Sequence, residues 1–266
     1  YVAVEFFGQI TNVEFYGCNI KANPTAISEK SVIMRYTNTN TSQNVLTNVR
    51  IIKNNISGGY HGIYFKYPAG TDAGTFARSS VTIDSNTITE CYARSLYLEY
   101  DGIYNSISHN NIVARLHSTS YHQYGIHLSK ATVFNGVVGN KILLQAKSAT
   151  GIYLSEYNAL DRMGDSTKNG LIANNEIRKI KTQIDDKVKG IEVASNSRAD
   201  IYHNSVYLDG FGKVEGIAIG AAKSLNVKNN IFAVRSRTEA YALTTTKREY
   251  VAFKKDVINI ILSLMR

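Results

Sequence analysis

The chain has 266 residues, of which 44% are hydrophobic and 19% are charged, and its formal net charge is +9. This composition excludes a disordered protein, and the sequence has no run of eighteen apolar residues that would cross a membrane as a helix. The basic balance favours a polyanionic partner, such as an acidic polysaccharide, nucleic acid or a phosphate-rich surface, although net charge also serves plain solubility.

The cysteines and the first ten residues bear on the context of the protein. Cys18 and Cys91 are too few for a disulfide framework and lack metal-ligand spacing, so no metal site is predicted. Residues 1–10 have neither the basic stretch nor the cleavage site of a signal peptide, and they do not include methionine. We therefore expect a fragment or processed form whose start has been removed.

Two short motifs alternate along the chain, and both predict short strands because they are rich in β-branched and aromatic residues with a period of two. The first motif is Asn, any residue, then Ile or Val, and it occurs at 18–20 (with Cys18 in the Asn position), 54–56, 86–88, 110–112, 140–142, 175–177, 204–206 and 229–231. The second is small, apolar, variable, apolar, and it occurs at 62–67, 95–100, 125–130, 151–156, 190–195 and 216–221.

Neither motif has enough apolar surface for a core of its own, so the repeat predicts a solenoid whose stacked turns share one core. A further apolar residue lies three positions before the Asn of each copy as far as Ile201. In the last copy Asn226 takes this position, which predicts a register slip of one residue near the end. The first apolar residue of the second motif is expected to form one buried column: Ile63, Leu96, Ile126, Ile152, Ile191 and Ile217.

The Asn ladder and the stacked apolar columns resemble the right-handed parallel β-helix family, which includes pectate-lyase-like enzymes, phage tailspikes and many bacterial surface proteins. The resemblance covers about residues 10–246. It implies an all-β fold over residues 1–246, a single-stranded right-handed parallel β-helix of about seven to eight coils. Asparagine suits a ladder because its amide both donates and accepts hydrogen bonds, and it tolerates the left-handed conformation of a sharp turn. The predicted ladder contains Asn54, Asn86, Asn110, Asn140, Asn175 and Asn204, and the predicted loops are 67–80, 115–124, 155–170 and 181–189.

Residues 247–266 differ in character from the repeats. Their apolar positions follow helical spacing, and solenoids need caps on their open ends. We therefore expect a short amphipathic helix over the last coil, and a non-native tail is the alternative. The apolar positions are Tyr250, Phe253, Val257, Ile260, Ile261 and Leu264.

The variable position of the second motif faces outward if its two neighbours face the core. It reads Tyr64, Tyr97, His127 and Tyr153 on four consecutive coils, followed by Glu192 and Ala218. At about 4.8 Å per coil, these four rings form a stripe roughly 14 Å long. The next outward position places Lys66 and Glu99 beside the stripe. An aligned row of rings with polar neighbours suits an extended glycan, and the alternative is that the rings only brace the parallel strands.

The resemblance to family enzymes implies acids clustered on adjacent coils, which hold calcium in lyases and act as acid and base in hydrolases. The outward column four residues before each closing apolar residue contains one acid, Asp84, and the flank of the stripe contains only Glu99. The paired carboxylates of glycoside hydrolysis are therefore missing from these columns. No cofactor is expected, and calcium is expected only for a lyase. Acids of the predicted loops remain the alternative site: Asp101, Glu156, Asp161, Asp165, Asp185 and Asp186.

These observations favour a secreted or cell-surface repeat protein that binds or adheres to polysaccharide, acidic in kind, without catalysis. The first alternative is a polysaccharide lyase or glycoside hydrolase that acts on an acidic glycan, and the second is a rigid spacer within a larger surface protein. No pattern of a specific nucleic-acid module is present.

Overall fold

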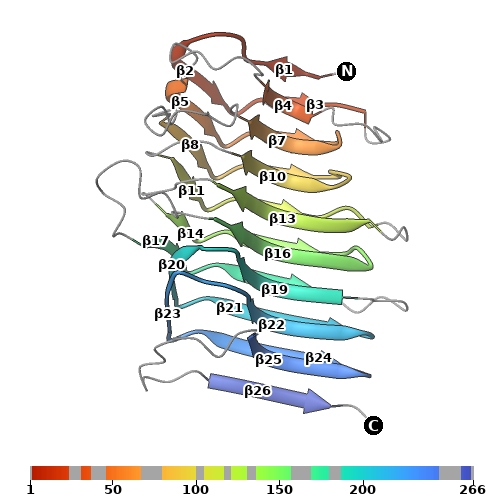
Figure 1. Cartoon of the computed structure of the whole chain (residues 1–266). Coiled ribbons are helices and arrows are strands. Elements are labelled where there is room, and N and C mark those ends of the chain that lie inside the picture. The colour runs from red at the N-terminus through yellow and green to blue at the C-terminus, as the bar shows by residue number, and fades with distance from the viewer. Residues whose placement is uncertain are drawn as a thin grey trace.

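The computed structural model describes residues 2–23, 31–36, 46–66, 80–99, 105–116, 121–130, 136–156, 169–179, 187–245 and 259–264. Within these residues the regular structure is all β-strand, arranged in three sheets that we call A, B and C. Every pair of neighbouring strands is parallel, and neighbours in a sheet are three strands apart in the chain over most of the fold. The chain therefore visits the three sheets in turn and forms a parallel β-helix, with β1 and β26 at opposite ends of the stack (Figure 1).

The three sheets contain nine, eight and nine strands in the described part of the chain, which is close to the predicted seven to eight coils. Sheet A contains β1 (Val4–Glu5), β4 (Ser31–Tyr36), β7 (His61–Lys66), β10 (Arg94–Glu99), β13 (His122–Ser129), β16 (Ser148–Ser155), β19 (Lys187–Ala194), β22 (Lys213–Ile219) and β25 (Glu239–Thr245). Sheet B contains β2 (Ile10–Tyr16), β5 (Leu46–Ile52), β8 (Val81–Asp84), β11 (Ser106–Ser108), β14 (Val137–Val138), β17 (Gly170–Ala173), β20 (Arg198–Tyr202) and β23 (Ser224–Lys228). Sheet C contains β3 (Asn19–Lys21), β6 (Asn55–Ser57), β9 (Thr87–Thr89), β12 (Asn111–Val113), β15 (Lys141–Leu144), β18 (Glu176–Lys179), β21 (Ser205–Gly210), β24 (Ile231–Ser236) and β26 (Asn259–Leu264).

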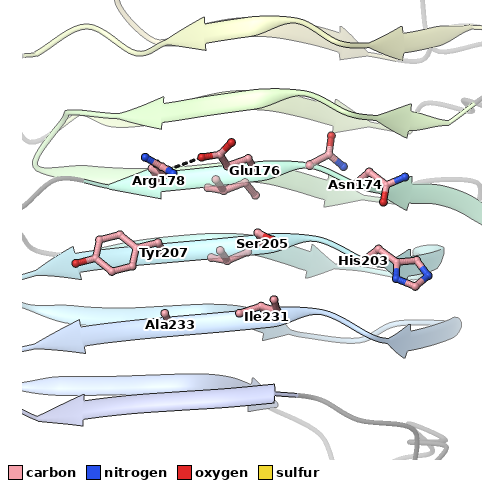
Figure 2. A pocket seen from close by; sticks show the side chains of 11 residues that line it. Asn174, Glu176, Arg178, His203, Ser205, Tyr207, Ile231 and Ala233 are labelled. Atoms are coloured by element: carbon pink, nitrogen blue, oxygen red, sulfur yellow. Dashed lines mark ion pairs between the residues drawn. The ribbon is translucent and has the colours of Figure 1, made fainter.

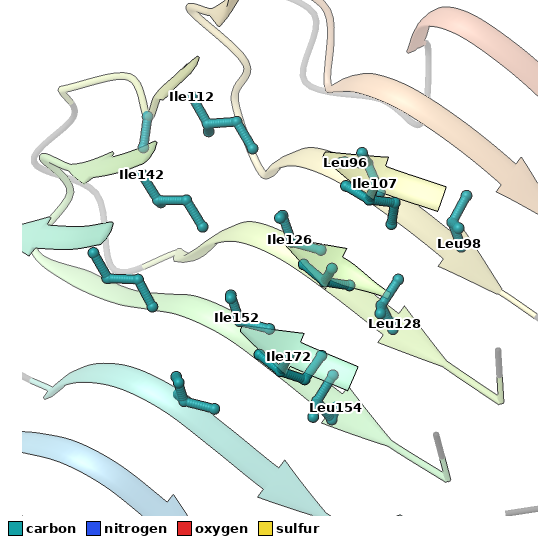
Figure 3. Close-up of a cluster of buried hydrophobic side chains, with 14 of the residues drawn as sticks. Leu96, Leu98, Ile107, Ile112, Ile126, Leu128, Ile142, Ile152, Leu154 and Ile172 are labelled. Atoms are coloured by element: carbon teal, nitrogen blue, oxygen red, sulfur yellow. The ribbon is translucent and has the colours of Figure 1, made fainter. Parts of the chain in front are cut away.

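The two sequence motifs lie on different sheets of the same coil. The second motif forms strands of sheet A, and its first apolar residues stack as predicted: Leu96 pairs with Ile63 on one side and with Ile126 on the other. All six members of this column are fully buried. The core between the sheets is built from such columns of Ile, Leu and Val, as Figure 3 shows for its central coils.

The predicted Asn ladder is confirmed and follows one repeated pattern of hydrogen bonds. The Asn140 Oδ1 accepts from the backbone N–H of Asn110 at 3.0 Å and from its Nδ2 at 2.9 Å. The Asn140 Nδ2 donates to the Ile107 carbonyl oxygen and to the Asn175 Oδ1, both at 3.0 Å. Each amide therefore joins its own coil to the coils on both sides, and at the first copy Cys18 enters the pattern through its backbone N–H, which donates to the Asn54 Oδ1 at 2.9 Å.

The last copy of the Asn motif is one residue later than expected, and the predicted register slip is wrong. Asn230, not Asn229, accepts from the Asn204 Nδ2 at 2.9 Å, and Phe232 pairs with Val206. Asn229 instead has a φ of 53°. The residue before the ladder Asn is left-handed in every coil from β2 onward, so the sharp turn between sheets B and C is made there and not by the ladder Asn itself: Gly17, Lys53, Ser85, His109, Gly139, Asn174, His203 and Asn229.

The small residue of the second motif is explained by its contact with the Asn motif of the same coil. A Cβ on Gly151 would lie 2.6 Å from the Ile177 Cγ2 and 2.6 Å from the Gly190 carbonyl oxygen. The same clash with the closing apolar residue of sheet C would arise at Gly62, Gly125 and Gly190. Glycine is favoured at these four positions because the backbone of sheet A lies directly against sheet C, so an added Cβ would force its neighbours to move. Ser95 is the one copy of the motif in which a side chain is accommodated at this position.

The predicted C-terminal helix is wrong where the structure describes this segment. Residues 259–264 form β26, which pairs in parallel with β24, so Ile260 lies opposite Phe232 and Leu262 opposite Val234. The apolar run satisfies strand pairing as well as helical spacing, and the free edge of β24 supplies a partner for its backbone. Of the predicted loops, 67–79 and 157–168 lie outside the described residues, whereas His122 and Lys187 already belong to β13 and β19.

Candidate functional site

The outer face of sheet A carries the predicted stripe in the predicted register. Tyr64 pairs with Tyr97, Tyr97 with His127, and His127 with Tyr153. Ring centroids of successive members lie 4.9, 4.5 and 4.6 Å apart, and the rings of Tyr64 and Tyr97 are stacked with an interplanar angle of 4°. The four rings therefore form a continuous contact across β7, β10, β13 and β16.

The stripe is less exposed than its outward position suggested. Tyr64 is 3% exposed and His127 is 7% exposed, whereas Tyr97 and Tyr153 are partly exposed. Tyr64 and His127 are therefore largely covered by neighbouring side chains, whereas Tyr97 and Tyr153 are the members of the stripe with accessible surface.

A second outward column, which the sequence analysis missed, covers the buried rings. Its members lie one residue before the small residue of the motif, and it reads His61, Arg94, Tyr124, Thr150, Lys189 and Glu215. The strict alternation of the strand breaks at the small residue, because that residue and the following Ile both face the core. The residue before the small one therefore faces outward, three positions from the stripe, and the column could have been found by applying this correction.

Arg94 lies between His61 and Tyr124 in this column. Its Nε donates a hydrogen bond to the His127 Nδ1 at 2.8 Å, and its guanidinium lies 4.5 Å from the ring centroid of Tyr97 and 5.4 Å from that of Tyr124. Within the described part of the chain, the guanidinium makes these ring and imidazole contacts and no ion pair with a carboxylate. The face therefore holds a positive charge that lies against aromatic rings and that pairs with no carboxylate of the described residues.

The imidazoles around Arg94 are held neutral. Burial lowers the pKa of His127 to about 2, with Arg94 adding to the effect, and burial followed by Arg94 lowers the pKa of His61 to about 3. The geometry agrees for His127, because only an unprotonated Nδ1 can accept from Arg94. His61 is 2% exposed and its Nδ1 has no hydrogen-bond partner among the described residues, so protonation would place a buried charge beside the guanidinium of Arg94.

The carboxylates of these outward columns, Glu99, Glu192 and Glu215, are each paired with a lysine, and Glu215 pairs with Lys213 at 3.1 Å. Lys66 and Glu99, both predicted to flank the stripe, lie 3.3 Å apart, and the Tyr64 hydroxyl donates to Glu99 at 3.2 Å. Glu192 pairs with Lys189 at 2.6 Å. The strands that carry Glu99 and Glu192 are three steps apart in the sheet, a separation of roughly 14 Å, whereas hydrolytic carboxylate pairs lie within about 10 Å. Glu192 and Glu215 lie on the neighbouring strands β19 and β22, but each is paired with a lysine.

The other predicted acid, Asp84, lies on sheet B in a network of its own. Burial would raise the pKa of Asp84, but hydrogen bonds from Ser108, His109 and Ser85 outweigh it and lower the pKa. Its Oδ1 lies 2.6 Å from the Ser108 hydroxyl and 3.0 Å from the His109 Nδ1. No other carboxylate joins this network in the described residues. The acids of the predicted loops lie outside the described residues, except Glu156, which pairs with Lys130 at 3.7 Å.

Among the described residues, no three His, Cys, Asp or Glu side chains are grouped so that they could hold a metal ion together, and no helix has the length and apolar character of a membrane span. No family model matches the chain, and no curated protein or solved structure is significantly similar to it. The parallel β-helix with its Asn ladder is therefore established by the structure, and no comparison assigns it to the pectate-lyase-like superfamily.

Proposed function

We propose that this chain is a secreted or surface-displayed β-helix of the pectate-lyase-like type, and that it binds an acidic polysaccharide along the outer face of sheet A without catalysis. The observation that carries the proposal is Arg94, whose guanidinium lies among aromatic rings with no carboxylate partner among the described residues.

Arg94 suits a ligand carboxylate or sulfate because of how it is held. Guanidinium groups bind planar anions through paired N–H donors and are less strongly hydrated than ammonium groups. The Nε–H is already used by His127, so the two terminal nitrogens are the donors left for a ligand. Contact with the rings of Tyr97 and Tyr124 fixes the plane of the group, which reduces the entropy that binding would cost.

The neighbouring rings suit the apolar faces of sugar residues. Tyr97 and Tyr153 are partly exposed and lie two strands apart, so they offer two platforms along one line with Arg94 beside them. The net charge of +9 favours association with a polyanion over a longer range. Glu99 lies three strands from Glu192, and the neighbouring carboxylates Glu192 and Glu215 are each paired with a lysine, which supports binding over the enzymatic alternative.

Affinity electrophoresis in gels that contain a polyuronate or a neutral glucan tests the proposal. The wild-type protein is expected to be retarded by the polyuronate alone. Arg94→Gln should abolish most of the retardation, and the double variant Tyr97→Ala/Tyr153→Ala should weaken it, because each ring contributes about 0.5–1.5 kcal/mol of stacking. Tyr241→Ala is the matched control, since this exposed tyrosine lies on β25 of the same sheet, away from Arg94.

Three results would contradict the proposal. Equal retardation of Arg94→Gln and wild type would show that Arg94 does not contact the ligand. Equal retardation of the tyrosine double variant, with a lower melting temperature, would show that the rings only brace the sheet. Release of reducing ends or unsaturated products from the polyuronate would show that the protein is an enzyme.

A further inference from the structure

The outer face of sheet C carries a groove of about 550 Å³ that crosses β18, β21 and β24 (Figure 2). Its floor exists because Ser205 and Ala233 have small side chains, while the residues beside them in the pairing register are large. Ser205 lies between Glu176 and Ile231, and Ala233 lies beside Tyr207. The sizes of side chains on three stacked strands therefore create the depression.

The walls of the groove combine exposed apolar surface with polar groups. Tyr207 is 49% exposed and Ile231 is 45% exposed, although both are large apolar side chains on a surface otherwise rich in polar residues. Arg178 and Glu176 form an ion pair through the Arg178 Nε, shown by the dashed line in Figure 2. The charges of Arg178 and Glu176 therefore offset each other, whereas Arg94 on sheet A has no carboxylate partner among the described residues.

The opposite rim is formed by Asn174 and His203, which occupy the left-handed position of the turn with φ values of 55° and 56°. The residues that follow them, Asn175 and Asn204, are joined in the ladder by a hydrogen bond of 2.9 Å between side chains. The rim groups are thus attached to the most strongly cross-linked part of the backbone. A site on such a scaffold needs little ordering when a ligand binds.

We propose that this groove is a second binding site, which accepts a neutral sugar residue. Ligand sites typically present apolar and aromatic surface with a few directed polar groups, and here Tyr207 and Ile231 would contact the C–H face of the sugar. Glu176, Arg178, Asn174 and the Ser205 hydroxyl supply both acceptors and donors for ligand hydroxyl groups. The internal ion pair leaves no net charge to hold an anion. The site lies on a different sheet from Arg94 and does not depend on the acidic ligand proposed there.

Photo-crosslinking with neutral oligosaccharide probes tests this site directly. The probes are tetrasaccharides of glucose, mannose and N-acetylglucosamine with a diazirine at the reducing end, and mass spectrometry locates the modified residues. At least one probe is expected to label residues of β18, β21 or β24. Tyr207→Ala should weaken binding of that probe about two- to tenfold. Ala233→Leu should block the floor and abolish labelling without changing the melting temperature, since the side chain is on the outer face.

Controls separate this site from sheet A and from nonspecific stickiness. Tyr16→Ala removes a tyrosine that is exposed on sheet B and should leave labelling unchanged. Arg94→Gln should also leave labelling unchanged, whereas Ala233→Leu should leave polyuronate retardation unchanged. Failure of every probe to label the groove at millimolar concentration, or equal labelling of Ala233→Leu, would overturn the proposal. Stronger labelling by a mononucleotide or peptide probe would overturn the assignment to sugar.

Discussion

Replacement of Asn140 by alanine removes one rung from the centre of the ladder. The buried side chain makes four hydrogen bonds of 2.9–3.0 Å: two from Asn110 to its Oδ1 and one from its Nδ2 to each of Ile107 and Asn175. At a net 0.5–1.5 kcal/mol for each bond, the expected loss in the free energy of unfolding is about 2–6 kcal/mol. The upper part of this range is favoured because the buried N–H of Asn110 loses the acceptor on Asn140.

Urea unfolding followed by circular dichroism measures this loss, and hydrogen exchange of the Asn110 amide reports the local effect. The control is Asn111→Ala, which removes an exposed Asn from the next position on β12 and should change stability by less than about 0.5 kcal/mol. Exchange at Asn110 should accelerate in Asn140→Ala alone. Equal stability of the two variants, with equal exchange at Asn110, would refute the structural role assigned to the ladder.

Two further perturbations test the packing of sheet A. Gly151→Ala places a Cβ 2.6 Å from the Ile177 side chain and from the Gly190 carbonyl oxygen and should lower the free energy of unfolding by about 1–3 kcal/mol. Ser95→Ala is the control, because a side chain is already accommodated at this one position of the six, and it should lower the free energy of unfolding far less. Equal urea midpoints of the two variants would contradict this. For His61, the folded pKa of about 3 lies below the ordinary 6.5, so the unfolded chain takes up a proton first and stability falls as pH decreases from 6.5 towards 3. This single group contributes about 1.4 kcal/mol per pH unit, and His61→Phe should reduce the pH slope of stability by that amount; an unchanged slope would show that His61 is not held neutral.

Most of the fold could be predicted because a β-helix repeats its own geometry. The Asn amides and the Ile column recur in fixed order, and parallel pairing then dictates which residues are neighbours across coils. The prediction for the last copy of the Asn motif was wrong because Asn229 and Asn230 are adjacent asparagines that could each begin it, and the turn conformation distinguishes them. That error also placed Ile231 in the core, which concealed the groove on sheet C where it is exposed.

The candidate site was predicted only in part, for a local reason. The stripe from Tyr64 to Tyr153 followed from alternation, but Arg94 did not, because alternation breaks at the small residue of the motif. The exposed fraction of each ring in the stripe could not be predicted either, because the burial of Tyr64 and His127 depends on side chains from neighbouring strands and on His61 and Tyr124 beside them. The position of one residue in a strand thus indicates its direction but not its accessibility.

The Arg94 Nε–H resonance in a nitrogen-edited NMR spectrum reports directly on whether an acidic ligand reaches this guanidinium, and its hydrogen bond to His127 slows exchange with water. A uronic-acid oligosaccharide and its methyl ester, which differ only in charge, are titrated in parallel. Binding at Arg94 predicts a saturable shift of this resonance with the acid and little or none with the ester. Equal shifts with both ligands, or no shift with either, would contradict recognition of an acidic polysaccharide by Arg94.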